Sequence, residues 1–400
     1  MTSAASPGQR AYRLDSIDML RGLVIVIMAI DHVRDYIVFG AQADPTSDPN
    51  VSAAMFFTRW ITHYCAPVFT VLAGVSAGLM TARKSHGELG RFLLTRGLWL
   101  IFVELVIVST AWTFAPGGIA EIGGLTMIPL QVIWAIGISM VALAGLQYLG
   151  RSACLWLGVA IIAGHNLLDS FWPAAQLLDT KWPLWVALHS QMAIAAPPLL
   201  FINVYPFPAW IGVMLLGFGA SRIFELPEQR RNALLLRAGL ALTAAFIVLR
   251  ALDVYGDPNH WQAQAGGAVA TLIDFLNTTK YPPSLLFLLM TLGPAAITCA
   301  VSGAVPAAIR DRLSTFGRVP FAFYIVHLYL IHLISVALGW AQGFAPGQML
   351  TLFFFFPKGY GLPLGGVYIV WALVVVALYP LCRWMAAVKA RRRDWWLSYV

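Results

Sequence analysis

The residues of this chain best placed for chemistry are Asp18 and His32, which lie at opposite ends of one apolar run. Every residue from Gly22 to Ile30 is apolar. At about 1.5 Å of rise per helical residue, the interval from Asp18 to His32 corresponds to roughly 20 Å. One helix could therefore present an Asp18–Arg21 ion pair at one membrane face and a titratable imidazole toward the other. Because a neutral imidazole can take a proton from a hydroxyl or an amine, His32 is the predicted general base.

Polar side chains beside His32 and in the next apolar run extend this candidate site. Asp31 and Asp35 flank the histidine, and a carboxylate such as Asp31 could hold its tautomer, although adjacent helical residues point about 100° apart. Arg59 and His63 are four positions apart, so they share one helical face. Arg59 could orient a carbonyl, and His63 could act as a second acid or base. In the alternative interpretation these residues are structural. His32 then only satisfies a buried hydrogen bond, Arg59 extends its charged end to the membrane interface, and His63 packs against its neighbours.

The composition defines the class of protein that the chain forms. Of 400 residues, 59% are hydrophobic and 11% are charged, whereas roughly one quarter are charged in soluble domains. We predict an all-α, polytopic membrane bundle that forms one domain over residues 1–400, with cytoplasmic tails at 1–16 and 388–400. Ten apolar runs are long enough to span, namely 20–37, 57–80, 92–114, 125–149, 154–168, 208–224, 233–252, 282–305, 319–338 and 367–382.

The distribution of basic residues sets the predicted topology. The run 184–204 holds several polar residues and two prolines, so we predict a re-entrant or interfacial element there instead of an eleventh span. Twenty of the 26 Lys and Arg residues then fall on one side, and six fall on the other, namely Arg34, Arg59, Lys181, Arg250, Lys280 and Lys358. The positive-inside tendency places both termini in the cytoplasm. The net charge of +8 follows from this topology and does not indicate a nucleic-acid partner.

Histidine and aromatic residues gather toward the predicted outer side. Seven of the eight histidines lie there or at membrane depth, and ionisable residues in lipid usually face a bundle interior or a wet cavity. An interfacial aromatic belt is the alternative explanation for the aromatic clusters. We predict an acceptor vestibule formed by Asp35, His165, His189, Tyr205, His260, Lys280 and Tyr281.

Other polar and small residues within the spans are predicted to be structural. Glu104, His327 and His332 are assigned to helix packing or hydration, although a charged Glu104 requires a partner in lipid. Gly74 and Gly217 are expected to allow close contact between helices. All four cysteines fall in predicted spans, and no pair of histidines has ligand spacing on one helical face. The sequence therefore predicts neither disulfides nor a metal site.

The chain resembles, over nearly its whole length, the membrane acyltransferases related to heparan-α-glucosaminide N-acetyltransferase. The motifs that carry the resemblance are SIDMLRG at 16–22, DHVRD at 31–35, RWITHYCAP at 59–67, YPPS at 281–284 and RRDWW at 392–396. The opening is also similar to that of the wider transmembrane acyltransferases that modify bacterial glycans, whose commonly conserved His falls on His32. The resemblance implies acyl transfer from cytoplasmic acyl-CoA, expected to be acetyl-CoA, to an acceptor beyond a plasma or inner membrane.

We therefore predict direct transfer from acyl-CoA to a glycan amine or hydroxyl, with no metal and no acyl-enzyme. Arg83, Arg96 and Arg318 are the predicted ligands of the CoA phosphates, because Arg binds phosphate bidentately, although positive-inside topology alone also explains basic residues there. The expected partners are the lipid bilayer and a small-molecule or glycan acceptor, and a homodimer is left open. The alternative function is a proton-coupled secondary transporter or flippase, which would be built from repeated halves with paired broken helices.

Overall fold

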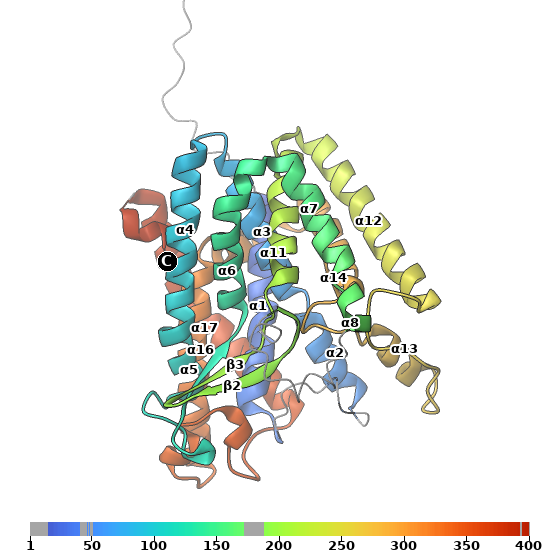
Figure 1. The fold of residues 1–400 in the computed structure, drawn as a ribbon. Helices are drawn as coiled ribbons and strands as arrows, with labels where there is room; N and C mark the ends of the chain where they lie inside the picture. The colour runs from blue at the N-terminus through green and yellow to red at the C-terminus, as the bar shows by residue number, and fades with distance from the viewer. Residues whose placement is uncertain are drawn as a thin grey trace, which may run out of the picture.

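The computed structural model describes residues 15–40, 46, 48, 51–171, 188–392 and 394–399, and these form a helical bundle with a small sheet at one end (Figure 1). Most of the predicted tail 1–16 and residues 184–187 of the predicted re-entrant run lie outside the described residues. The described helices are α1 Asp15–Ile37, α2 Ala53–Thr62, α3 Cys65–Met80, α4 His86–Val103, α5 Ser109–Thr113, α6 Val132–Leu146, α7 Arg151–Gly164, α8 Leu167–Phe171, α11 Pro208–Ala220, α12 Glu228–Leu252, α13 Ala268–Leu276, α14 Leu285–Ala300, α15 Ala307–Arg318, α16 Pro320–Ala341 and α17 Leu364–Arg391.

Seven helical stretches in the described part of the chain are long and apolar enough to cross a membrane. They are Ala53–Met80, His86–Thr113, Val132–Leu149, Arg151–Asp169, Glu228–Leu252, Pro320–Ala341 and Leu364–Arg391. Each coincides with one of the ten predicted spans. The other three predictions fall on α1, which carries charged residues at both ends, and on α11 and α14, which have 13 and 16 residues. The chain is a multi-pass helical membrane protein, and the count of ten stays a prediction.

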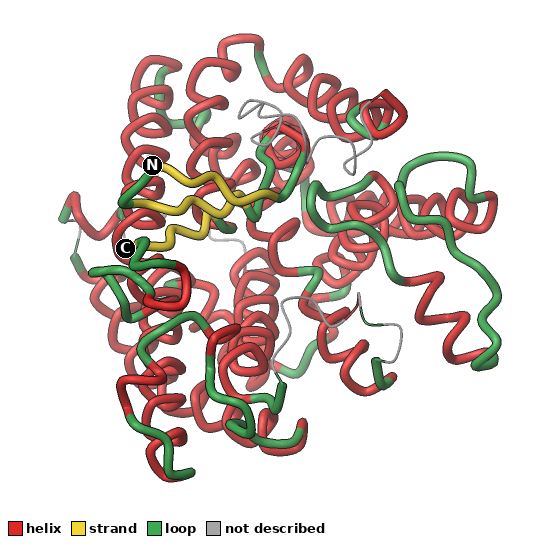
Figure 2. The backbone as a smooth tube through the Cα atoms, turned by 60° about the horizontal axis from the view of Figure 1, so that its bottom comes forward, coloured by secondary structure: helices red, strands yellow, loops and turns green. Residues whose placement is uncertain are grey.

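A three-stranded sheet corrects the purely helical prediction. Its strands are β1 Thr126–Leu130, β2 Met192–Ala196 and β3 Leu199–Asn203, in the order β1-β3-β2 (Figure 2). Strand β3 pairs parallel with β1, which aligns Thr126 with Leu199, and antiparallel with β2. The predicted span 125–149 is therefore helical only from Val132, and the run 184–204 contains a hairpin. A short apolar run does not distinguish a buried strand from a helix, which explains the error.

Helix α1 lies at the centre of the bundle, where it packs against α15, α16 and α17. Its contact with α15 requires glycine, because a Cβ at Gly22 would lie 1.8 Å from the Leu313 carbonyl oxygen. The predicted close approach at Gly74 and Gly217 is confirmed between α3 and α11, where a Cβ on either residue would lie 2.1 Å from a carbonyl oxygen of the other helix. The contact at Gly22 fixes the axial position of α1 against α15.

The ends of the chain differ slightly from the prediction. Helix α1 already begins at Asp15, and α17 continues to Arg391, so the predicted tail boundaries at 16 and 388 fall inside helices. After α17, a short 3₁₀ helix at Trp395–Ser398 returns to the bundle, where the Trp99 indole donates to the Tyr399 carbonyl at 3.1 Å.

Buried Glu104, in a π-helical segment between α4 and α5, has the partner that the sequence required. Its Oε2 accepts the backbone N–H of Trp134 at the start of α6, at 2.8 Å. A carboxylate at a helix N-terminus stabilises otherwise unpaired N–H groups. Glu104 thus anchors the junction between β1 and α6.

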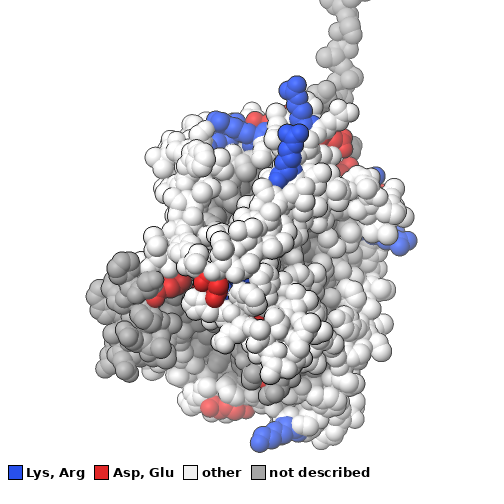
Figure 3. Space-filling view, turned by 90° about the vertical axis from the view of Figure 1, so that its right-hand side faces the viewer, with Lys and Arg blue, Asp and Glu red and all other residues white. Residues whose placement is uncertain are grey.

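The two ends of the bundle carry different charges. Lys and Arg side chains concentrate at one end (Figure 3). The α3–α4 turn with Arg83 and Lys84 lies there, as do the first residues of α7 and α12 (Figure 1). We call this the basic end, and the opposite end, which carries the three strands, the sheet end.

Candidate functional site

A cavity of about 490 Å³ opens at the sheet end of the bundle. The last turns of α1, the end of α2, the sheet and the loops before α11 and α14 form its walls. Seven of the predicted site residues line it, namely Asp31, His32, Asp35, Arg59, Tyr205, Lys280 and Tyr281. The structure thus brings together predicted site residues from four separate stretches of the chain. We call it the sheet-end cavity.

An ion-pair network fixes one wall of the sheet-end cavity. Asp31 contacts both Arg59 and Arg34, the latter at 3.2 Å, and Arg34 also contacts Asp35. Arg34 is only 2% exposed, so its charge depends on these two carboxylates. Asp31 therefore holds the arginines and is not the orienting partner of His32.

The partner of His32 is His327 on α16, which sequence reasoning assigned to packing. His32 Nδ1 lies 2.7 Å from His327 Nε2, and the ring centroids are 4.9 Å apart. Both side chains are buried, and the Trp112 and Tyr324 rings meet the His32 ring edge to face at 5.2 and 6.1 Å. No local pattern around His327 signals this pairing, because the two histidines are 295 positions apart.

Hydrogen bonding along α16 fixes which nitrogen of His32 is basic. His327 Nδ1 lies 2.9 Å from the Phe323 carbonyl oxygen, and a carbonyl oxygen can only accept, so Nδ1 carries the proton. In a neutral ring, His327 Nε2 is then the acceptor, and His32 Nδ1 must donate to it. This arrangement leaves the lone pair of His32 on Nε2.

The two tyrosines of the sheet-end cavity lie in contact with each other. Tyr205 is buried against Tyr281, with ring centroids 5.1 Å apart, and Arg59 Nη2 donates to the Tyr281 hydroxyl at 3.4 Å. Burial, and secondly the neighbouring Tyr281, raises the pKa of Tyr205 well above its ordinary value. Its hydroxyl therefore stays protonated.

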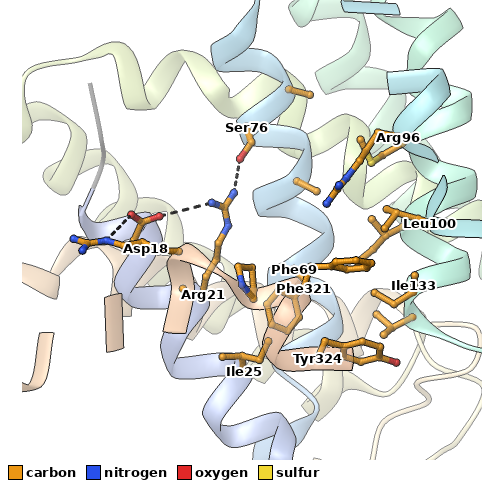
Figure 4. A pocket seen from close by; sticks show the side chains of 18 of the residues that line it. Asp18, Arg21, Ile25, Phe69, Ser76, Arg96, Leu100, Ile133, Phe321 and Tyr324 are labelled. Atoms are coloured by element: carbon orange, nitrogen blue, oxygen red, sulfur yellow. Dashed lines mark hydrogen bonds and ion pairs between the residues drawn. The ribbon is translucent and has the colours of Figure 1, made fainter. Parts of the chain in front are cut away.

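A second cavity of about 530 Å³ opens toward the basic end (Figure 4). Asp18, Arg21, Arg96, Arg318 and Lys389 contribute its charged groups. Arg318 Nε and Arg21 Nη1 lie 3.8 and 3.9 Å from the Asp18 carboxylate, and Arg21 Nη2 also donates to the Leu72 carbonyl oxygen at 3.0 Å and to the Ser76 hydroxyl. We call this the basic-end cavity.

Arg96, which lines the basic-end cavity, is held between two aromatic rings. Its guanidinium carbon lies 5.3 Å from the Phe321 ring centroid and 5.6 Å from that of Tyr399. Of the three predicted CoA-binding arginines, Arg96 and Arg318 line the cavity, whereas Arg83 does not.

The two cavities approach each other in the C-terminal half of α1. Tyr324 lines the basic-end cavity, His32 lines the sheet-end cavity, and their rings are in edge contact. Residues Val132 and Gln131, adjacent at the start of α6, also face different cavities. A thin layer of side chains from α1, α6 and α16 therefore separates the two spaces.

Four predicted site histidines lie elsewhere. His63 packs against Phe287 on α14, with ring centroids 5.4 Å apart. His165 and His189 form a separate cluster in which His189 Nε2 lies 2.5 Å from Asp169. His260 is exposed and pairs with a carboxylate at 2.9 Å. None of the four is among the lining residues of the two cavities.

Neither a metal nor a cysteine nucleophile has structural support in the described part of the chain. No group of three or more His, Cys, Asp or Glu side chains there could hold a metal ion. The buried Cys65 thiol contacts the Val24 carbonyl oxygen at 3.1 Å. The described residues that line the sheet-end cavity present carboxylate, imidazole, guanidinium, ammonium and phenol groups.

Fold and site together define a helical membrane protein with two cavities that approach each other beside the buried His32. Residues 13–255 match the family model of the catalytic region of heparan-alpha-glucosaminide N-acetyltransferase, and the chain belongs to this family. Membership implies a membrane acetyltransferase-like activity. No curated protein matches the chain. The matched region contains His32 and Arg59, whereas Lys280, Arg318 and His327 lie beyond it.

Proposed function

We propose that this protein transfers an acyl group from acyl-CoA in the basic-end cavity to an amine or hydroxyl acceptor in the sheet-end cavity. The observation that carries the proposal is the contact between His32 and Tyr324, which brings the two cavities together beside one basic nitrogen. A thioester near this layer and an acceptor on the other side would meet with little movement.

His32 is the general base of the proposed reaction. Its Nε2 takes the proton of the acceptor while the acceptor nitrogen or oxygen bonds to the thioester carbonyl carbon. The carbon–sulfur bond then breaks, and CoA leaves as the thiol with the proton that His32 held. His327 holds the required tautomer, and Arg59 is the candidate stabiliser of the oxyanion because it lines the same cavity.

The charges of the basic-end cavity suit the donor. Arg21, Arg96 and Arg318 supply guanidinium groups, and Arg binds phosphates through paired N–H donors. By the positive-inside tendency the basic end faces the cytoplasm, where acyl-CoA is made, and the acceptor approaches from the far side of a plasma or inner membrane. A glycan acceptor, acetyl as the acyl group, and cytoplasmic termini belong to the same proposal.

Binding and slow hydrolysis of acetyl-CoA by the purified full-length protein test the proposal. Wild type should bind acetyl-CoA and release CoA, and His32→Ala should bind equally but lose turnover about 100-fold or more, the scale of general-base catalysis. His260→Ala is the matched control, because this histidine is exposed and lies outside the cavities. Absence of acetyl-CoA binding by folded wild type would refute the proposal and favour the transport alternative.

A further inference from the structure

Among the described residues, Lys280 is the one lysine that lines the sheet-end cavity, and its surroundings differ from those of the arginines there. It is 7% exposed, and its Nζ lies 5.1 Å from the Tyr281 ring centroid. Among the described residues, no carboxylate lies within 4.0 Å of this ammonium, and no side chain or carbonyl accepts a hydrogen bond from it. Arg34 and Arg59, in contrast, both pair with Asp31.

The loop that carries Lys280 is fixed in place. Asp257 accepts the backbone N–H of Thr279 at 2.8 Å and the hydroxyl of Ser284 at 2.6 Å, and the Ser284 N–H donates to the Thr279 carbonyl oxygen at 2.9 Å. Lys280 therefore projects from a loop that is tied on both sides. A held cation needs no reorganisation when a ligand arrives.

Asp31 is a carboxylate that interacts electrostatically with Lys280, but it already pairs with Arg34 and Arg59. Burying a cation with no counter-ion of its own is costly, and ionisable groups retained at membrane depth usually face a pathway or a ligand. An anion that enters the cavity would supply the missing charge and accept up to three N–H bonds from the ammonium. We infer that Lys280 forms an anion subsite, and that the acceptor carries a carboxylate or phosphate beside its reacting amine or hydroxyl. This inference rests on the proposed function for the identity of the ligand as the acceptor.

The volume of the cavity restricts the size of this acceptor. About 490 Å³ is typical of a small-molecule site, so one or two sugar-sized units fit, and a long polymer would enter only by its end. The aromatic rings of Trp112, Tyr205 and Phe353 supply apolar walls, and Asn203 and Gln191 supply amides. The expected ligand is a compact, polar and acidic molecule or chain end.

Equilibrium binding without acyl-CoA tests the inference independently of catalysis. Glucuronate and glucose differ only in the carboxylate, and glucose 6-phosphate adds the phosphate arm. Wild type should bind both acidic probes roughly 10–100-fold more tightly than glucose, the range of a charge-assisted hydrogen bond. Lys280→Met should abolish this preference and Lys280→Arg should keep most of it. Lys358→Met, which changes an exposed lysine, should not alter it.

Lipid phosphate is a second source of the same anion. Competition by short-chain phosphatidylglycerol, but not by phosphatidylcholine, against the bound probe would assign the subsite to an anionic lipid headgroup and still support an anion site at Lys280. Equal binding of glucuronate, glucose 6-phosphate and glucose by wild type, or an unchanged preference in Lys280→Met, would overturn the inference.

The catalytic assay separates this inference from the proposed function. If acetyl-CoA turnover depends on His32 but wild type does not prefer the acidic probes over glucose, the anion subsite is refuted and the proposed acyl transfer stands. If wild type prefers the acidic probes but does not bind acetyl-CoA, the proposed acyl transfer is refuted and the anion subsite stands. A Lys280→Met variant that lowers kcat equally for acidic and neutral acceptors, with unchanged binding of the acidic probes, would assign the ammonium to the reaction itself and overturn the subsite.

Discussion

The pairing of His32 with His327 leads to a prediction about a residue that lines neither cavity. Replacing His327 with Leu removes the acceptor of the 2.7 Å hydrogen bond from His32 Nδ1. The donor is buried, and an unsatisfied buried donor costs about 1–3 kcal/mol. At about 1.4 kcal/mol per factor of ten, this cost corresponds to a roughly 5- to 150-fold decrease in rate. We expect the decrease in kcat, because the His32 ring can rotate or change tautomer once its acceptor is removed.

The assay is acetyl-CoA turnover over a range of acetyl-CoA concentrations, normalised to the folded fraction. KM should change less than about threefold, because the substrate does not contact His327. His327→Gln should recover much of the activity, since its side-chain oxygen can accept the Nδ1 proton. A purely structural role would predict neither the split between kcat and KM nor this recovery.

His332 provides the matched control for this experiment. It lies five positions further along α16 and is also buried, but among the described residues its nitrogens bond to the carbonyl oxygens of Ala111 and Met349 and to no other histidine. His332→Leu should lower stability and leave kcat per folded molecule nearly unchanged. Equal loss of kcat in the Leu variants of His327 and His332 would refute the tautomer argument.

Two further predictions concern the donor site and the packing of α1. Arg96→Leu should raise the KM for acetyl-CoA about tenfold, because it removes one charge-assisted contact, whereas Arg83→Leu should not, since Arg83 lies outside the cavity; equal KM values for the two variants would contradict this assignment. Gly22→Val should lower stability by about 1–3 kcal/mol or more, because its Cβ would meet the α15 backbone, whereas Gly87→Ala has open space. Thermal unfolding checks this, and an unchanged melting temperature for Gly22→Val would show that the two helices do not meet there.

Much of the membrane architecture could be predicted from local sequence. Long apolar runs identify spanning helices because lipid cannot satisfy exposed backbone groups, and seven of the ten predicted runs coincide with long apolar helices. The sheet was missed because β1 continues directly into the apolar sequence of α6. Pairing with β3, which follows some seventy residues later, decides that Thr126–Leu130 is a strand.

The candidate site distinguishes more clearly than the fold between what the sequence predicts and what the tertiary structure decides. Composition and spacing alone placed His32, Asp31 and Arg59 near one membrane face, since these depend on helical rise and on the few polar residues in apolar runs. Only the tertiary structure decided that His32 pairs with His327 and that Asp31 pairs with arginines instead. The reason is geometric, because the partner of a side chain on a helix is set by which helix packs against that face. In this chain close backbone contacts at glycines such as Gly22, which meets α15, join segments far apart in the sequence.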